Sequence, residues 1–235
     1  MMRLVQVTWD KRAVFLERPN RFLALAQING DTKVQKVHVR DPGRLKELLF
    51  PGNELLVKYA GKPGRKTSWD LMAAKFQGEW IPLNSGLHPA IARAILENPE
   101  ISPFGAVCSI TGEVKYGKSR LDFLIQTVND EKIYIEVKGC TLMKGQTALF
   151  PDAPTARGRR HLQELMEIRK TGIRSAVVFL IFQGRSRAFQ ANRRTDPEFA
   201  KVLSEAAGNG VEIYPVLLEY RHDIIWYKSI IPVKI

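Results

Sequence analysis

Cysteine is scarce in this 235-residue chain, which contains only Cys108 and Cys140 and no CxxC pair. This excludes a disulfide-rich scaffold and a cysteine zinc cluster, and we expect both thiols to be reduced. The four histidines lack the spacing of a zinc site. No apolar run approaches the roughly 18 residues of a membrane helix, and the first residues lack the apolar core of a signal peptide. We therefore expect a cytoplasmic protein with no membrane partner.

Repeats, low-complexity stretches and a nucleoside-triphosphate loop are also missing. The segment 61–66 is rich in glycine and lysine but lacks the GxxxxGK[ST] spacing that cradles phosphates. What the chain has instead is positive charge: 36 Lys and Arg against 24 Asp and Glu, a formal net charge of +12. This excess predicts a polyanionic partner, with nucleic acid ahead of an anionic membrane surface. The alternative is a charge excess that only keeps the protein in solution.

Residues 1–85 have the pattern of a small β-barrel. Short segments with alternating apolar and polar residues are separated by turn residues, and Asn29-Gly30-Asp31 signals a hairpin between two of them. This pattern predicts an oligonucleotide/oligosaccharide-binding (OB) barrel, with an SH3-like barrel as the alternative. The predicted elements are strands 3–7, 13–18, 22–28, 34–39, 54–59, 71–76 and 79–81, and one short helix at 43–49.

Residues 86–235 change to a mixed α/β pattern, and we place a domain boundary near residue 85. The continuous apolar run at 175–182 predicts a buried central strand of a mixed sheet. The predicted fold class is α+β, an OB-like, nucleic-acid-binding barrel followed by an α/β domain. The elements predicted for this second domain are helix 89–97, strands 106–116, 120–127 and 132–138, helix 156–170, strand 175–182, helix 197–207 and strand 211–218.

Three charged residues stand out in the strands of the second domain. Residues i and i+2 of a strand share a face, so Glu136 and Lys138 point to one side while Val137 points to the other. If the neighbouring strand brings Asp122 alongside, two carboxylates can hold a hard divalent cation, Mg²⁺ or Mn²⁺, beside an ammonium group. Phosphodiester hydrolysis needs these parts, because the cation activates water and lysine orients it or stabilises negative charge. The alternative is a solvated strand edge with a weak ion pair.

Glu113, on the strand at 106–116, is a candidate third metal ligand. The alternative is a surface carboxylate paired with Lys115, two residues further along the same strand. The sequence favours neither of these two interpretations.

The order of these elements, with an Asp before Glu-x-Lys, resembles the PD-(D/E)XK nuclease superfamily, although Leu121 stands where the short pattern has Pro. The amino-acid sequences of several segments are more specific and resemble the sugar fermentation stimulation protein A (SfsA) family. The resemblance implies an OB-like barrel, a PD-(D/E)XK nuclease-like domain, non-specific DNA binding and a regulatory link to sugar metabolism. It also places Asp122, Glu136 and Lys138 at the nuclease signature positions. The segments that carry it are 41–45, 113–117, 119–123, 134–138, 150–158 and 161–165.

Basic side chains near this site are candidate DNA contacts. Arg157, Arg160 and His161 belong to the start of the predicted helix at 156–170 and can project toward the site or toward DNA phosphate. Arg157 and His161, four residues apart, share a helical face. Arg120 is a further candidate on the strand of the predicted aspartate. An exposed basic helix face is the alternative interpretation.

Two other groups of cations carry aromatic residues between them, which suits phosphate contact combined with base stacking. Solvated basic loops are the alternative in both places. The barrel group contains Lys58, Lys62, Arg65 and Lys66 with Tyr59 and Trp69, and the second group contains Arg185, Arg187, Arg193 and Arg194 with Phe189.

The sequence therefore supports three hypotheses. The first is a non-specific DNA-binding protein with a metal-dependent nuclease site, which the intact set of Asp122, Glu136 and Lys138 favours. The second is a DNA-binding transcriptional regulator whose nuclease-like domain is catalytically silent, with a role in sugar (maltose) metabolism that only the family resemblance implies. The third is an RNA-binding barrel protein with an inert second domain.

Overall fold

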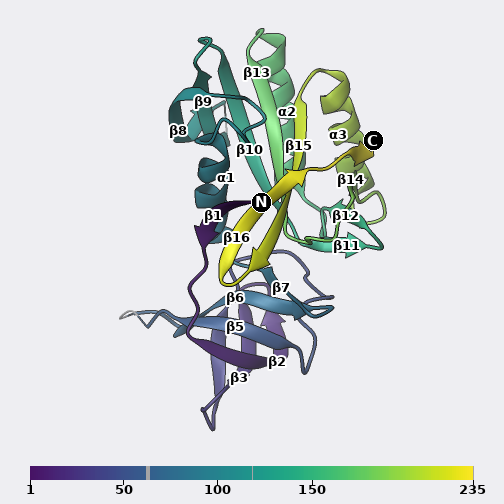
Figure 1. Cartoon of the computed structure of the whole chain (residues 1–235). Coiled ribbons are helices and arrows are strands. Elements are labelled where there is room, and N and C mark those ends of the chain that lie inside the picture. Colours follow the sequence, from purple (N-terminus) through teal and green to yellow (C-terminus); the bar gives the residue numbers. More distant parts are fainter. Residues whose placement is uncertain (62–63, 118, 235) are drawn as a thin grey trace. The chain divides into compact units, whose positions relative to one another are not determined.

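The computed structural model describes residues 1–61, 64–117 and 119–234, which form two compact units (Figure 1). One unit comprises Val5–Leu87 and Tyr220–Ile225, and the other comprises Met1–Leu4, His88–Glu219 and Trp226–Ile235. The division into functional domains at residue 85 stays a prediction. Among the described helices, none has the length and apolar character needed to cross a membrane.

The unit that begins at Val5 contains a six-stranded sheet, five strands of which close into a barrel. Its strands are β2 (Lys11–Asn20), β3 (Leu23–Ile28), β4 (Val34–His38), β5 (Glu54–Tyr59), β6 (Trp69–Phe76) and β7 (Glu79–Pro82). The order is β4-β3-β2-β5-β6-β7, and a parallel pairing of β4 with β6 closes the barrel, while β7 extends the sheet beyond β6. Along β3, Ala24, Ala26 and Ile28 are buried at every second position. β3 and β4 pair antiparallel on either side of Gly30, which has a φ of 91°, so the predicted hairpin is confirmed.

The helix predicted at 43–49 is wrong, because this segment forms an irregular turn. The guanidinium of Arg18 donates hydrogen bonds to the carbonyl oxygens of Gly43 and Arg44, both at 2.7 Å. Carbonyls that accept from a side chain compete with the backbone bonds of a helix. Leu45, inside this segment, has a φ of 51°, which is not a helical value, and is completely buried.

The other unit is built on a mixed seven-stranded sheet (Figure 1). Its strands are β1 (Met2–Gln6), β8 (Val107–Tyr116), β9 (Ser119–Thr127), β10 (Lys132–Cys140), β13 (Arg174–Ile181), β15 (Glu212–Arg221) and β16 (Ile224–Ile230), in the order β1-β16-β15-β13-β10-β9-β8. β13 lies in the middle, pairs parallel with β10 and β15, and is buried along nearly its whole length, as predicted. The helices are α1 (His88–Leu96), α2 (Ala156–Lys170) and α3 (Pro197–Gly208), preceded by the short 3₁₀ turn η1 (Ser85–Leu87).

The sequence analysis missed the seven-residue strand β16 and four short strands. A second sheet contains β11 (Leu142–Lys144), β12 (Thr147–Phe150), β14 (Ala188–Ala191) and β17 (Val233–Lys234), in the order β11-β12-β14-β17. Segments of two to four residues are too short to show a period. The strand predicted at 3–7 is also corrected: it was expected in the barrel, but as β1 it joins β16 in the large sheet. No local pattern reveals a pairing between the two ends of a chain.

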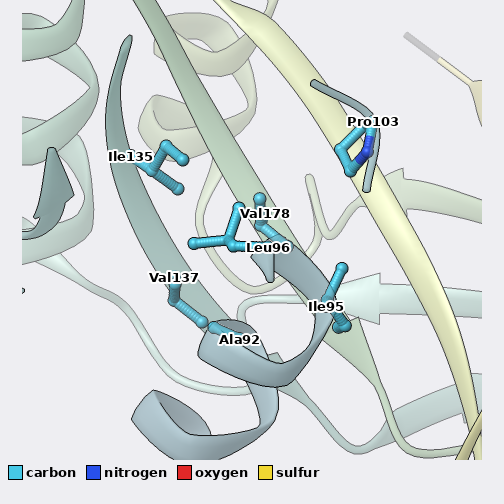
Figure 2. Close-up of a pocket in the computed structure, with 7 residues that line it drawn as sticks. All are labelled: Ala92, Ile95, Leu96, Pro103, Ile135, Val137 and Val178. Atoms are coloured by element: carbon cyan, nitrogen blue, oxygen red, sulfur yellow. The ribbon is translucent and has the colours of Figure 1, made fainter. Parts of the chain in front are cut away.

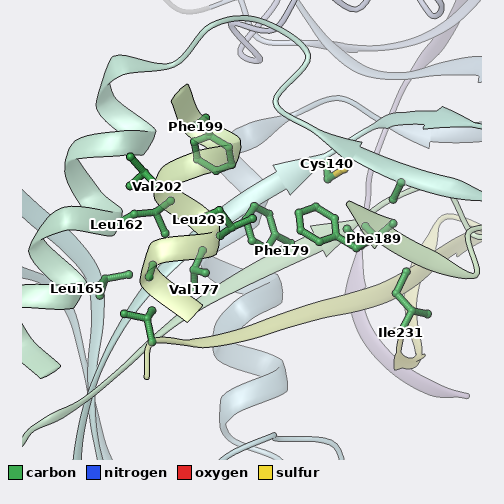
Figure 3. Packing of buried hydrophobic residues seen from close by; sticks show 14 of the residues in the cluster. Cys140, Leu162, Leu165, Val177, Phe179, Phe189, Phe199, Val202, Leu203 and Ile231 are labelled. Carbon is green, nitrogen blue, oxygen red and sulfur yellow. The ribbon is translucent and has the colours of Figure 1, made fainter. Parts of the chain in front are cut away.

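Opposite faces of the large sheet pack against different helices. In Figure 3, Phe179 of β13 packs with Phe189 and with residues of α2 and α3, and the two phenylalanine ring centroids lie 4.3 Å apart. Because Phe189 is fully buried, the prediction that it stacks on bases among neighbouring arginines is wrong. On the other face, Ile135 and Val137 of β10 line a small apolar cavity with residues of α1 (Figure 2).

Candidate active site

Strand β10 divides apolar from charged side chains. Its side chains Ile135 and Val137 face α1, so Glu136 and Lys138 point to the opposite face, where α2 packs. Glu136 is 3% exposed and Lys138 is 16% exposed. The predicted shared face is therefore present, and it is shielded from water, unlike the solvated edge that was the alternative.

Asp122 lies beside these two residues because β9 and β10 part at this point. The last described pair of their ladder is Phe123 with Ile135, and beyond it the backbone N–H of Val137 donates to Asp122 Oδ2 at 2.7 Å. A side-chain carboxylate thus takes the place of a strand carbonyl. The hairpin brings Asp122 alongside Glu136, which was the condition of the predicted site.

The two oxygens of Glu136 have different surroundings. Oε1 accepts from Lys138 Nζ at 2.5 Å and from Nδ1 of His161, whose side chain is 2% exposed. Oε2 is buried and has no hydrogen-bond partner among the residues that the structure describes. A buried carboxylate oxygen without a hydrogen-bond partner costs folding free energy, so it needs a chemical explanation.

The carboxylates influence each other's ionisation. Burial raises the pKa of Asp122 to about 6, and the negative charge of Glu136 adds to the rise, although the hydrogen bond from Val137 opposes it. Burial also raises the pKa of Glu136, but the hydrogen bond from His161 and the charge of Lys138 outweigh it and leave this pKa below its ordinary value. At neutral pH the site therefore holds two negative charges close together.

Helix α2 supplies the third side of the site. Thr155 caps its first turn by accepting a hydrogen bond from Gly158 N at 3.0 Å. One turn on, His161 is buried against Glu136, and Arg157 Nε donates to His161 Nε2 at 3.3 Å. The sequence left open whether His161 points toward the site or toward DNA phosphate. In the structure it points toward the carboxylates. Arg157 remains exposed.

The other predicted contacts of this domain lie at the rim or away from the carboxylates. Arg160 is exposed, and its Nε donates to Ser119 Oγ at 3.2 Å. Glu113 and Arg120 form an ion pair at 3.1 Å with side chains 78% and 67% exposed, so in the described structure the partner of Glu113 is Arg120 and not the predicted Lys115. Among the described residues, no group of three or more His, Cys, Asp and Glu side chains has a metal-binding arrangement. A third protein ligand at Glu113 stays a prediction.

The predicted cations of the barrel differ from one another in their contacts. Lys58 Nζ donates to Thr8 Oγ1 at 2.5 Å, Arg65 pairs with Asp70, and Lys66 is exposed. Lys62 falls outside the described residues. The aromatic pair is present: Tyr59, 57% exposed, meets Trp69 edge to face at 5.3 Å, and an exposed ring of this kind can stack on a base.

His88 is a neighbour of the site that the sequence did not reveal. Its ring stacks on Phe182 at 5.5 Å and lies against Gly139, the residue after Lys138. Burial and the charge of Lys138 lower the pKa of His88 to about 4, so the ring is neutral at physiological pH. No spacing signal connects two residues so far apart, and only the glycine after Glu-x-Lys hinted at a close approach.

Gly139→Ala should destabilise the protein by about 1–3 kcal/mol, because the new methyl group overlaps the ring of His88. Nε2 of that ring would lie 2.7 Å from the Cβ atom, and the stacked ring has little room to move. Urea unfolding measures the effect. The matched control is Gly112→Ala on β8, where the nearest atom lies 3.9 Å from the added Cβ. Equal stability of the two variants would contradict the prediction.

Two known domain families match this chain. A family profile described as "SfsA N-terminal OB domain" matches residues 16–83, and one described as "Sugar fermentation stimulation protein RE domain" matches residues 86–223. The chain belongs to the sugar fermentation stimulation protein (SfsA) family. The predicted resemblance is thus confirmed, and so is the fold class, an OB barrel followed by a restriction-endonuclease-like (RE) α/β domain.

Members of the SfsA family from other organisms match nearly the whole chain. A "Sugar fermentation stimulation protein homolog" from Methanococcoides burtonii is 42% identical and covers 97% of this chain and 94% of its own length. A homologue of the same description from Moorella thermoacetica is 44% identical, with 86% and 87% covered. The structure described as Pyrococcus furiosus SfsA in complex with Ca²⁺ has a TM-score of 0.91 and 30% identity, and each chain is covered completely.

The buried carboxylate cluster lies in the SfsA RE domain. Asp122, Glu136, Lys138 and His161 all fall within the matched residues 86–223. The barrel cations fall within the OB match at 16–83. The two kinds of predicted site residue are therefore divided between the two family domains.

Proposed function

We propose that this SfsA-family protein binds DNA non-specifically and hydrolyses phosphodiester bonds with Mg²⁺ or Mn²⁺. The observation that carries the proposal is the pair of carboxylates, Asp122 and Glu136, with the buried Glu136 Oε2 lacking a hydrogen-bond partner in the described part of the chain. Lys138 can balance only one of these two buried negative charges, so the remaining charge is unfavourable unless a further cation binds. A resident cation explains both the crowding and the unpartnered oxygen.

The donor set suits a hard divalent cation. Carboxylate oxygens are the preferred ligands of Mg²⁺, which is commonly bound through one or two carboxylates while water and substrate phosphate fill the other positions. Asp122 and Glu136 therefore suffice as protein ligands, with Glu113 as a further candidate. The Pyrococcus furiosus relative was solved in complex with Ca²⁺, another oxygen-bound cation, which supports a divalent-cation site.

The protein's own groups would act around the reacting phosphate. When bound, the cation polarises a phosphoryl oxygen and lowers the pKa of a water molecule. Lys138 Nζ, anchored on Glu136 Oε1, is placed to orient the attacking water or to stabilise the negative charge that develops on the phosphoryl group. The apolar residues beneath β10 keep the charged face partly dry, which strengthens these interactions.

DNA binding is proposed from charge and from the exposed cations around the site. The net charge is +12, and Arg157 and Arg160 are exposed at the start of α2. Arg120 is a further candidate on β9, the strand of Asp122, and the barrel adds Lys58, Lys62, Arg65 and Lys66 beside an exposed Tyr59. Contacts of this kind read the phosphate backbone, so the logarithm of affinity should fall linearly with the logarithm of salt concentration and depend little on sequence.

The test is cleavage of labelled single- and double-stranded DNA with Mg²⁺ or Mn²⁺ by the wild type and by Lys138→Ala, purified in parallel. Metal-dependent cutting by the wild type that the variant loses is the expected result. The matched control is Lys132→Ala, an exposed lysine at the start of the same strand, which should cut like the wild type.

The same experiment separates the rival functions. DNA binding that weakens with salt, with no cutting under any metal, would favour a regulator of sugar metabolism with a catalytically silent domain. Preference for single-stranded RNA over duplex DNA in competition would favour the RNA-binding barrel. Cutting that survives in Lys138→Ala would place the nuclease site elsewhere or reveal a contaminating enzyme.

A further inference from the structure

We propose that Arg157 and His161 form a positioning pair that holds Glu136 in its metal-binding orientation. The chain of contacts runs from Arg157 Nε to His161 Nε2 at 3.3 Å, and from His161 Nδ1 to Glu136 Oε1. This inference rests on the proposed function, since it assigns a role toward the cation that Glu136 would hold. Neither residue touches the reacting groups in this arrangement.

The hydrogen-bond directions define one state of the imidazole. The guanidinium of Arg157 can only donate, so His161 Nε2 must accept and carries no hydrogen. The ring hydrogen is then on Nδ1, directed at Glu136 Oε1. Lys138 Nζ lies 3.4 Å from the same Nδ1, but it donates to Glu136 Oε1 instead, because a protonated Nδ1 cannot accept.

Both donors therefore converge on one oxygen of Glu136 and leave the other one open. Oε1 accepts from His161 and Lys138, while Oε2 is buried and accepts from none of the described residues. Two donors on Oε1 restrain the rotation of the carboxylate, so Oε2 remains available as a ligand for a cation. Partners behind a metal ligand commonly act in this way, setting its orientation and strengthening its affinity.

The rigidity of α2 makes the pair an effective support. His161 is 2% exposed and packs one turn after the capped start of the helix, so its ring has little freedom. Burial also removes His161 from direct contact with DNA. Arg157 is exposed and uses Nε for the contact with the imidazole, so its other guanidinium donors can also meet a phosphate.

The test is Mn²⁺ titration calorimetry on full-length wild type, His161→Leu, His161→Asn and Arg157→Met without DNA. We expect His161→Leu to weaken Mn²⁺ binding by about 10- to 100-fold. His161→Asn should restore most of the affinity, because its amide nitrogen replaces Nδ1 as a donor to Glu136. Arg157→Met keeps the length of the side chain but loses the donor, and it should lower affinity by a smaller factor. Gln163→Leu, an exposed position on the same helix, is the control.

A second measurement keeps the inference testable if His161→Leu does not fold. In ¹⁵N-histidine NMR spectra of the metal-free wild type, His161 should carry its hydrogen on Nδ1 alone, and Arg157→Met should weaken that preference. Hydrogen on Nε2 would overturn the inference. Equal Mn²⁺ affinity of wild type and folded His161→Leu would overturn it while leaving the proposed metal site intact, whereas a wild type that binds no Mn²⁺ would overturn both.

Discussion

Asp122→Asn should make the metal-free protein more stable at pH 8 while lowering its affinity for Mn²⁺ by at least about a hundredfold. The two effects have opposite directions because they arise from the same buried charge. Asparagine keeps the oxygen that accepts from Val137 N but removes the charge that Glu136 repels. Replacing an ordinary structural carboxylate in this way would destabilise the protein. Higher stability together with weaker Mn²⁺ binding is therefore specific to a charge that is retained for a ligand.

The pH dependence follows from the sign of the pKa shift. Asp122 has a raised pKa of about 6 in the folded protein against an ordinary value of 3.8. The native state therefore loses stability relative to the unfolded chain as pH rises through this window, by up to about 3 kcal/mol above pH 6. Asp122→Asn and the wild type should have similar stability below pH 4 and should diverge between pH 4 and pH 6.

Urea unfolding across this pH range, combined with Mn²⁺ calorimetry, measures both effects. The control is Asp130→Asn, the same substitution at an exposed turn position of the same hairpin, which should change neither quantity appreciably. A variant less stable than the wild type at pH 8 would show that Asp122 is stabilised by its surroundings. Unchanged Mn²⁺ binding would remove Asp122 from the metal site.

Asp196→Ala should cost about 3 kcal/mol of stability, the largest loss we expect from a residue outside the candidate site. This carboxylate, 3% exposed, caps α3 by accepting from Phe199 N at 2.9 Å. It also accepts from Thr155 N at 2.8 Å, at the start of α2, and from Arg159 Nη1 at 2.9 Å. One side chain thus ties together the first turns of two helices, one of which carries His161.

Acid should produce the same loss in the wild type. Burial raises the pKa of Asp196, but the hydrogen bonds from Thr155 and Phe199 and the charge of Arg159 outweigh it and hold the pKa below its ordinary value. Its contribution to stability is therefore complete above the ordinary pKa and disappears as pH falls through the lower native value.

Thermal or urea unfolding at pH 7 and in acid tests the prediction for Asp196. Asp196→Asn, which keeps one acceptor, should fall between the wild type and Asp196→Ala. Glu198→Ala, an exposed acid in the first turn of the same helix, should change stability by less than about 0.5 kcal/mol. If Glu198→Ala lost as much stability as Asp196→Ala, the effect would come from the negative charge at the start of the helix and not from the hydrogen bonds of Asp196.

Regular periodicity made the long elements predictable. The helix at 156–170 and the buried central strand follow from their apolar patterns, because each buries one face or its whole length. The helix prediction at 43–49 failed because Arg18, distant in the sequence, donates hydrogen bonds to carbonyl oxygens that a helix would need. The strands of the small sheet are too short to show a period.

The sequence by itself determined the family, the two fold types and the shared face of Glu136 and Lys138, because alternation along a strand is a local property. Only the tertiary structure decided which oxygen of Glu136 is left open, since that depends on α2 delivering His161 to one side of the carboxylate. Tertiary structure also placed β1 beside β16 and His88 against Gly139. Contacts between distant segments depend on packing and charge in three dimensions, which local patterns do not encode.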